Sequence, residues 1–141
     1  MRLLTQWFRR DPLTTAESGR AAQRYADRLL RRKGYKIVFR NLSDSNGELD
    51  LVARHAAFDG IIVIEVRSCS KNTPLRQEGV FPESKMQQVV QTARRILGKK
   101  RLAQQGLRFD ALIVTLDSES GRPKGMQHYE NAFTANRRDY F

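Results

Sequence analysis

Charged side chains at the ends of two apolar segments are the residues of this chain best placed to do chemistry. The segment 47–52 contains Glu48 and Asp50, and the segment 61–67 ends in Glu65 and Arg67. Because side chains alternate along a strand, the two residues of each pair point to the same face. If the segments pair as a hairpin, three carboxylates and one guanidinium converge. Convergent carboxylates in a basic protein indicate a divalent cation that faces a phosphate.

This chemistry is the metal-dependent cleavage of a phosphodiester bond. Oxygen ligands would hold a hard cation such as Mg²⁺ or Mn²⁺, and a positive side chain would offset the charge that develops on the phosphate in the transition state. We predict Asp50 and Glu65 as metal ligands, with Glu48 in support and the Val66 carbonyl as a further ligand. Arg67 would supply the positive charge.

The same four charged residues have a second interpretation. They could form a buried ion-pair cluster that binds no ligand, although such a cluster is a poor source of stability because its charges lose their hydration. Residues 61–64 are all apolar, and a charge at the end of such a strand is expensive unless it has a partner. A partner or a ligand is therefore expected in either case.

The overall charge indicates a polyanionic partner. The 141 residues include 26 Lys and Arg against 15 Asp and Glu, a formal net charge of +11. Such an excess favours nucleic acid over an anionic membrane surface as the partner. Arginines recur every fourth position from 20 to 28, which is typical of a phosphate-contacting stripe or of a solvated helix face. The basic residues predicted to contact nucleic acid are Arg20, Arg24, Arg28, Arg40, Arg67 and Lys85.

Other reactive residue types are weaker candidates. The single cysteine, Cys69, excludes a disulfide within the chain and fits a reducing compartment such as the cytoplasm. His55 and His128 lack zinc-type spacing, and His128 is expected to be a strand or packing residue. No apolar run in the sequence approaches the length of a membrane span, and no glycine-rich phosphate loop is present.

Hydrophobic periodicity predicts the elements that position these residues. A capping-box pattern from Thr14 to Glu17 opens a helix that Gly34 ends. Strands are predicted at 35–40, 48–54, 61–68, 109–116 and 126–129, with a loop at 70–81 and a second helix that starts at Pro82. The order predicts one α/β domain over residues 14–133, a mixed sheet flanked by helices, between a basic N-terminal extension (1–13) and a basic C-terminal tail (134–141).

The order of these motifs resembles a known group of nucleases. An Asp at a hairpin, followed by Glu-x-Lys at the end of the next strand, is the signature of restriction-endonuclease-like nucleases. More closely, the chain is similar to the YraN family of small bacterial proteins, a branch of that fold related to Holliday-junction resolvases. The matching pieces are Gly19-Arg20, Ala26, Gly34-Tyr35, Arg40-Asn41, residues 47–53, residues 63–67, Lys85, Ala93, Arg108-Phe109-Asp110, His128 and Asn131-Ala132-Phe133.

The resemblance implies a restriction-endonuclease-like fold, a mixed β-sheet flanked by helices. It further implies a Mg²⁺- or Mn²⁺-dependent endonuclease that selects DNA by structure rather than by sequence. Resolvase relatives work as dimers, so a homodimer would fit the resemblance, although the sequence identifies no dimer face.

Two positions depart from the family pattern. The glutamate usual on the first helix, where it can help to hold metal, is replaced by Gln23, which offers only a neutral oxygen. The lysine of Glu-x-Lys is Arg67, which keeps the charge and offers a bidentate fork for phosphate but cannot exchange a proton at ordinary pH. These departures favour a second hypothesis, a nucleic-acid-binding module without catalysis. A third hypothesis, an RNA- or ribosome-associated adaptor, is supported by the charge alone.

Overall fold

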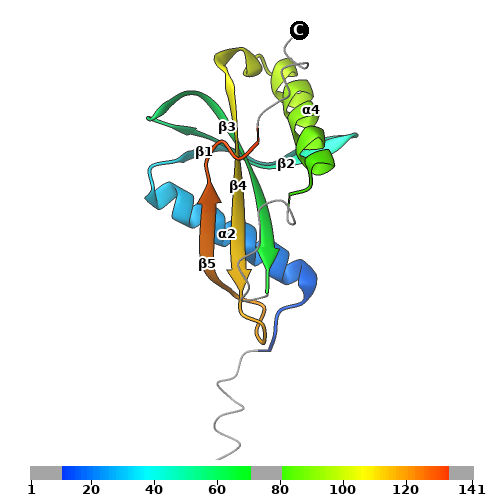
Figure 1. The fold of residues 1–141 in the computed structure, drawn as a ribbon, viewed down its shortest axis with the longest axis vertical. Coiled ribbons are helices and arrows are strands. Elements are labelled where there is room, and N and C mark those ends of the chain that lie inside the picture. Colours follow the sequence, from blue (N-terminus) through cyan, green and yellow to red (C-terminus); the bar gives the residue numbers. More distant parts are fainter. Residues whose placement is uncertain (1–10, 71–80, 134–141) are drawn as a thin grey trace, which may run out of the picture.

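A single mixed sheet with a helix on each face makes up the computed structural model, which describes residues 11–70 and 81–133 (Figure 1). The sheet has five strands in the order β1-β2-β3-β4-β5, antiparallel except for the parallel pair β3–β4. The elements are α2 (Thr15–Arg32), β1 (Lys36–Asp44), β2 (Gly47–His55), β3 (Phe58–Cys69), α4 (Glu83–Lys99), the 3₁₀ turn η1 (Ala103–Gln105), β4 (Leu107–Leu116) and β5 (Pro123–Tyr129). The predicted α/β class and the mixed sheet flanked by helices are confirmed.

Three sequence predictions concern segments outside the described residues. They are the N-terminal extension, of which 1–10 are not described, most of the loop at 70–81, and the tail at 134–141. In the described part of the chain, neither α-helix combines the length and the apolar character needed to cross a membrane.

Helix α2 begins and ends where its sequence signals are. The Thr14 side chain accepts a hydrogen bond from the Glu17 N–H while the Glu17 carboxylate accepts one from the Thr14 N–H, which is the predicted capping box. At the other end Gly34 adopts φ +91°, a left-handed conformation that costs glycine little. Its N–H bonds to the Arg31 carbonyl, and the next N–H, of Tyr35, bonds to the Leu30 carbonyl. This paired termination satisfies the last carbonyls and turns the chain into β1.

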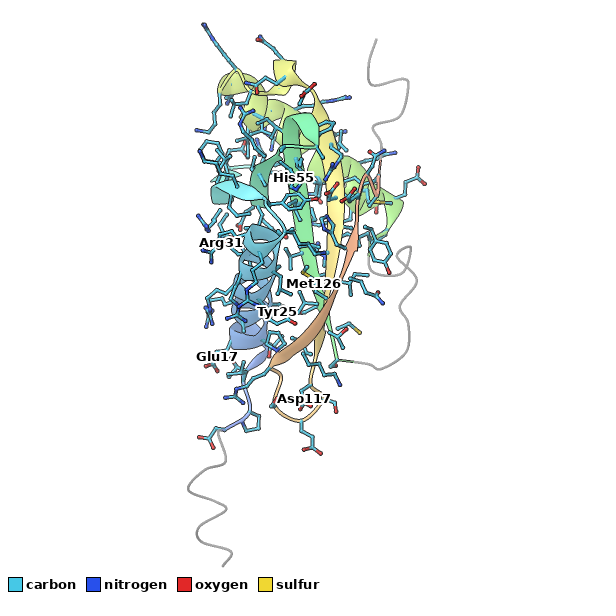
Figure 2. All side chains as sticks on the ribbon, turned by 90° about the vertical axis from the view of Figure 1, so that its left-hand side faces the viewer. Glu17, Tyr25, Arg31, His55, Asp117 and Met126 are labelled. Atoms are coloured by element: carbon cyan, nitrogen blue, oxygen red, sulfur yellow. The ribbon has the colours of Figure 1, made fainter. Side chains whose placement is uncertain are left out.

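Two apolar layers, one on each face of the sheet, form the core. Alternate residues of β3 divide between them: Ile61 and Val63 pack toward α4, whereas Ile62 and Ile64 pack toward α2. All four are fully buried, as a strand covered on both faces requires. In Figure 2, Tyr25 of α2 and Met126 of β5 lie in the layer between α2 and the sheet, while Arg31 lies on the outer side of the helix.

Strands β1 and β5 extend further than the sequence predicted. The prediction ended the first strand at Arg40, because Asn41, Ser43 and Asp44 are poor strand formers. In the structure these residues continue the antiparallel ladder, in which Leu42 is opposite Leu49 and Asp44 opposite Gly47. Pairing along the whole of β2 therefore outweighs the local preference.

A buried carboxylate joins the start of β4 to β5 and to the end of α2. Asp110 is fully buried and accepts hydrogen bonds from Arg108 Nε and Nη2, from His128 Nε2 and from the N–H of Asn131. Arg108 Nη2 also donates to the hydroxyl of Tyr35. Burial raises the pKa of Asp110, but these donors outweigh burial and hold the pKa below its usual value. His128 is thus a packing residue with a polar partner, as the sequence suggested.

We expect Asp110→Asn to lower the free energy of unfolding by about 3–5 kcal/mol, because Arg108 then stays buried without its charged partner. Urea denaturation followed by circular dichroism measures the change. Glu119→Gln, on the exposed turn between β4 and β5, is the matched control and should leave stability unchanged. Equal stability of the two variants would show that the network contributes nothing to the fold.

Candidate functional site

Strands β2 and β3 separate at Asp50, and two carboxylates bond to the backbone there. The regular ladder of this pair begins at Leu51, opposite Ile64. One step beyond it, the N–H of Asp50 donates to Glu65 Oε1 at 3.3 Å, and the N–H of Val66 donates to Asp50 Oδ2 at 2.9 Å. Side-chain oxygens thus replace the carbonyls that a continuing ladder would supply, and the two carboxylates are held next to each other.

The Asp50–Glu65 pair is electrostatically costly. Glu65 is only 3% exposed. Burial first, and then the neighbouring charge of Asp50, raise the pKa of Glu65 to about 8, although the Asp50 N–H and the Arg67 charge act in the opposite direction. Without a cation Glu65 therefore carries a proton at neutral pH. A paired acid of this kind, at a cavity, is a common feature of functional sites.

Two cavities border Asp50, one on each side of the sheet. The cavity on the α4 side has a volume of about 250 Å³ and is lined by Glu48, Asp50, Glu65, Arg67 and Lys85, together with residues of α4. The structure therefore gathers all the predicted catalytic residues around one cavity. Gly47 helps to place them, since a Cβ at this position would lie 2.5 Å from Thr92 Oγ1 on α4.

The second cavity, on the α2 side, has a volume of about 280 Å³. Gln23 and Ser68 line it, and Asp50 and Arg67 line both cavities. The guanidinium of Arg67 also lies 5.9 Å from the centre of the Phe81 ring. Its charge is thus available to a ligand in either cavity.

A break in the strand alternation explains how Asp50 reaches both sides. The prediction that Glu48 and Asp50 share a face assumed strict alternation, but Leu49 packs toward α4 and Leu51 toward α2. Between Arg40 and Leu42, the residues opposite Leu51 and Leu49, Asn41 adopts φ 51°, a left-handed conformation. A left-handed backbone in a residue other than glycine is uncommon, and such conformations cluster at functional sites.

Gln23, the residue that replaces the usual helical glutamate, lies beside Asp50. Its Nε2 donates to Asn41 Oδ1 at 2.8 Å and to the Asp50 carbonyl at 3.1 Å. Both N–H groups of the amide are therefore used within the protein. The amide oxygen makes no hydrogen bond with another residue of the described chain, so it remains the one atom of Gln23 that could face a cation.

The chemistry of the pair fits a hard divalent cation. The two carboxylates lie next to each other with the pKa of Glu65 raised, and Arg67 forms no ion pair with any carboxylate of the described residues, so a cation would relieve their repulsion. Within 11–70 and 81–133, no three Asp, Glu, His or Cys side chains are grouped closely enough to hold a metal together, so the pair itself is the candidate ligand set. Two carboxylates suffice for Mg²⁺, which keeps several waters when bound to protein.

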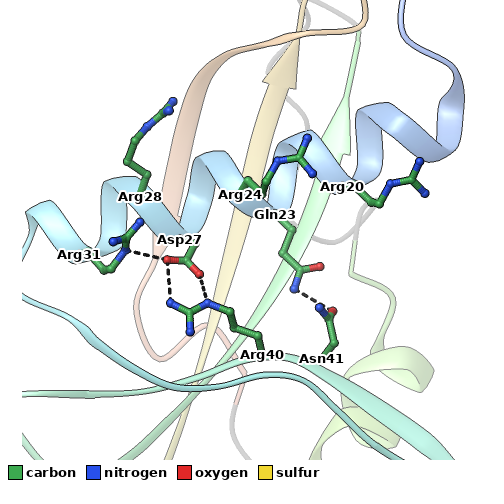
Figure 3. A pocket seen from close by; sticks show the side chains of 8 residues that line it. All are labelled: Arg20, Gln23, Arg24, Asp27, Arg28, Arg31, Arg40 and Asn41. Carbon is green, nitrogen blue, oxygen red and sulfur yellow. Dashed lines mark hydrogen bonds and ion pairs between the residues drawn. The ribbon is translucent and has the colours of Figure 1, made fainter.

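Figure 3 shows an arginine-lined pocket, which shares Gln23 with the α2-side cavity. It has a volume of about 520 Å³. The residues that line it, called the arginine pocket below, are Arg20, Gln23, Arg24, Asp27, Arg28, Arg31, Arg40 and Asn41. Four of the predicted nucleic-acid contacts thus come together here, whereas Arg67 and Lys85 lie at the carboxylate cavity.

Family membership follows from comparison with known proteins. A family model described as "Uncharacterised protein family UPF0102" matches residues 22–114, which include the carboxylate pair, Gln23 and Arg67. The chain belongs to the UPF0102 family. It is 34% identical over 120 residues to a UPF0102 protein of Rhodopirellula baltica, with 85% of this chain and 72% of that relative covered.

Two further relatives have similar coverage. A UPF0102 protein of Hahella chejuensis is 33% identical over 77% of this chain and 86% of its own length, and one of Pelotomaculum thermopropionicum is 35% identical over 82% and 93%. UPF0102 is the YraN family, so the resemblance inferred from the motifs is confirmed. The names of these relatives state the family and no activity.

The sequence analysis assigned no functional role to two residues of this UPF0102 site, Asp27 and Asn41. Asp27 is the one acid between Arg20 and Arg32 of α2 and precedes Arg31 by four residues, a spacing that predicts a helical ion pair. Asn41 carried no local signal, because its left-handed conformation depends on pairing with β2. Only its place beside Arg40 in the family motif distinguished it.

The pKa of Glu65 predicts how stability depends on pH. Because the folded protein holds this proton up to a pKa of about 8 and an unfolded glutamate loses it near 4.5, the folded state binds more protons in this interval. The contribution to stability is complete below pH 4.5 and is lost as pH rises through 8. The slope is at most about 1.4 kcal/mol per pH unit.

Urea denaturation with a chelator present, repeated across this pH interval, measures the effect. Glu65→Gln removes the titrating group without a large change in shape, and its stability should fall less with pH than that of the wild type. Parallel pH profiles for the two proteins would contradict the assignment of the raised pKa to Glu65.

Proposed function

We propose that this UPF0102 protein is a Mg²⁺- or Mn²⁺-dependent nuclease that hydrolyses phosphodiester bonds in DNA and selects structure rather than sequence. The observation that carries the proposal is the buried Asp50–Glu65 pair, held beside Arg67 and Lys85 at one cavity in a protein of net charge +11. Cys69 as the sole cysteine supports the cytoplasm as the compartment in which it acts.

Asp50 and Glu65 are the residues that would hold the cation. Each carboxylate has a second oxygen beyond the one that accepts a backbone N–H, and the Val66 carbonyl lies on the backbone between Glu65 and Arg67. A bound cation would supply positive charge to the phosphate and acidity to a water molecule. Glu65 must give up its proton to become a ligand, so cation binding and proton release are linked.

Arg67 has the role of binding the phosphate. A guanidinium stays charged at ordinary pH and offers paired N–H donors to phosphate oxygens. It neither donates nor accepts a proton there, so the attacking water must lose its proton to another group. Lys85, half-buried on the first turn of α4, provides a second positive charge at the same cavity.

We expect Mn²⁺ to bind the wild type with release of protons near pH 7, and Asp50→Asn and Glu65→Gln each to weaken that binding about tenfold or more, because each removes one of two charged ligands. Isothermal titration calorimetry in two buffers of different ionisation enthalpy measures both quantities. Asp44→Asn, at the turn between β1 and β2, is the control. The metal site is excluded if all four proteins bind Mn²⁺ equally weakly.

A second candidate function is nucleic-acid binding without catalysis. The observation that favours it is the state of Gln23, whose amide N–H groups both bond within the protein, at the position where related nucleases place a carboxylate. Helix α2 then contributes no carboxylate to the cavities that border Asp50. In this second function the basic surface binds nucleic acid, and no phosphodiester bond is hydrolysed.

Substitutions at Arg67 separate the two candidates. We expect Arg67→Ala to reduce cleavage of branched or single-stranded DNA with Mn²⁺ by about 10²-fold or more while DNA affinity changes by less than about tenfold, because the guanidinium acts on charge that develops during reaction. Arg67→Lys should retain cleavage.

A gel assay with chelator as the blank measures cleavage. The variant Gln23→Glu/Arg67→Lys restores the family pattern at both positions and serves as the positive control. If the wild type and this double variant are both silent on every form of DNA, the protein is a binding module.

A further inference from the structure

The arginine pocket differs from an ordinary basic surface because part of it is fixed in place. Asp27 lies at its base with a side chain only 9% exposed. Its Oδ1 accepts from Arg31 Nε at 2.8 Å, and both of its oxygens accept from Arg40, through Nε and Nη2 (Figure 3). One buried carboxylate therefore positions two guanidinium groups, one from α2 and one from β1.

These two arginines keep hydrogen-bonding capacity for a ligand. A guanidinium has five N–H donors, of which Asp27 takes one from Arg31 and two from Arg40. Arg24, also on the pocket wall, makes no hydrogen bond or ion pair with another described residue. Five arginines against a single carboxylate leave the pocket strongly positive. Convergent arginines with free donors are the usual way in which proteins recognise phosphate.

The pocket shares a wall with the carboxylate site. Gln23 lines both the arginine pocket and the α2-side cavity, and its amide bonds to the Asp50 carbonyl on one side and to Asn41 on the other. A strand whose phosphate lies at Asp50 can therefore continue past Gln23 into the pocket.

Helix geometry gives the distance along that path. Arg28 and Arg31 follow Gln23 by five and eight residues of α2, about 8 Å and 12 Å at 1.5 Å per residue. A nucleic-acid strand advances about 3.4 Å per phosphate along a helical axis. Counted from Gln23, which bonds to the Asp50 carbonyl, the part of the pocket at Arg28 and Arg31 is thus about two to four phosphates of helical rise away.

We propose that the arginine pocket is a second phosphate subsite for the strand that enters the carboxylate site, and that it holds a phosphate about two to four positions away. The protein would then select strands that extend on one side of the bound bond. The inference rests on the proposed function only in taking a nucleic-acid strand as the ligand. The phosphate is either an internal diester or a terminal monoester, since both present the oxygens that arginine binds.

Short DNA strands with two charged phosphates test the spacing. All other linkages are neutral methylphosphonates, and the separation of the two charged phosphates is varied from one to six positions. Binding is measured by fluorescence anisotropy at low salt with chelator, so no cleavage is needed. The wild type should bind most tightly at separations of about two to four. A separate series, with one charged group as a terminal monoester, distinguishes the two kinds of phosphate.

Matched variants identify the pocket. Arg24→Ala/Arg28→Ala should abolish the spacing preference, weaken binding to a uniformly charged DNA strand about tenfold and reduce the salt slope by about 1.4, the value for two lost contacts to a single strand. Arg32→Ala/Lys99→Ala removes the same charge from exposed positions outside the pocket and should keep the preference. Arg67→Ala should also abolish the spacing preference, because Arg67 binds the phosphate at the carboxylate site.

Asp27→Asn distinguishes a built pocket from diffuse charge. The substitution raises the net charge, so a diffuse basic surface would bind every strand more tightly. A pocket organised by Asp27 would instead lose its preference for one phosphate spacing. Circular dichroism checks that the variant is folded. Equal losses in the two double variants, or no preference in the wild type, would overturn the subsite. A clear preference for one phosphate spacing, without cleavage of any DNA, would support the subsite and contradict the proposed nuclease function.

Discussion

The end of the β2–β3 ladder is the constraint on which the rest of the site depends. Where the two strands separate, the N–H groups of Asp50 and Val66 lose their carbonyl partners, and a buried N–H without an acceptor is costly. The carboxylates of Glu65 and Asp50 satisfy them and in doing so are brought into mutual repulsion. One local requirement of the backbone thus produces both the geometry and the electrostatic cost of the site.

The two layers of the fold place a cavity on each side of this point. Because α4 and α2 cover opposite faces, a residue at the separation of β2 and β3 borders a cavity on each side, as Asp50 and Arg67 do. The left-handed Asn41 allows Asp50 to stand between the two apolar layers. Charge from α4, through Lys85, and from α2, through its arginines, consequently reaches the same two carboxylates from opposite directions.

The sequence was sufficient where periodicity and local signals agree. It predicted the capping box of α2, the burial of residues 61–64 and the shared face of Glu65 and Arg67, because each depends on residues close along the chain. It could not predict that Arg40 bonds to Asp27, that Asp110 gathers Arg108 and His128, or that alternation fails at Asp50. These features depend on which strands become neighbours, and that is decided by packing of the whole sheet.

The strand order also has a consequence for how the chain behaves during synthesis. The contacts at the carboxylates join residues 15 and 16 positions apart, whereas the bond between Tyr35 and Arg108 spans 73. Because short loops close first, the β1–β2–β3 hairpins can assemble before β4 is available. Until residues 107–116 emerge, the apolar strand 61–64 lies at an open sheet edge, which is the feature most prone to pairing with another chain. The nascent protein is therefore most vulnerable to aggregation at the strand that carries its candidate site.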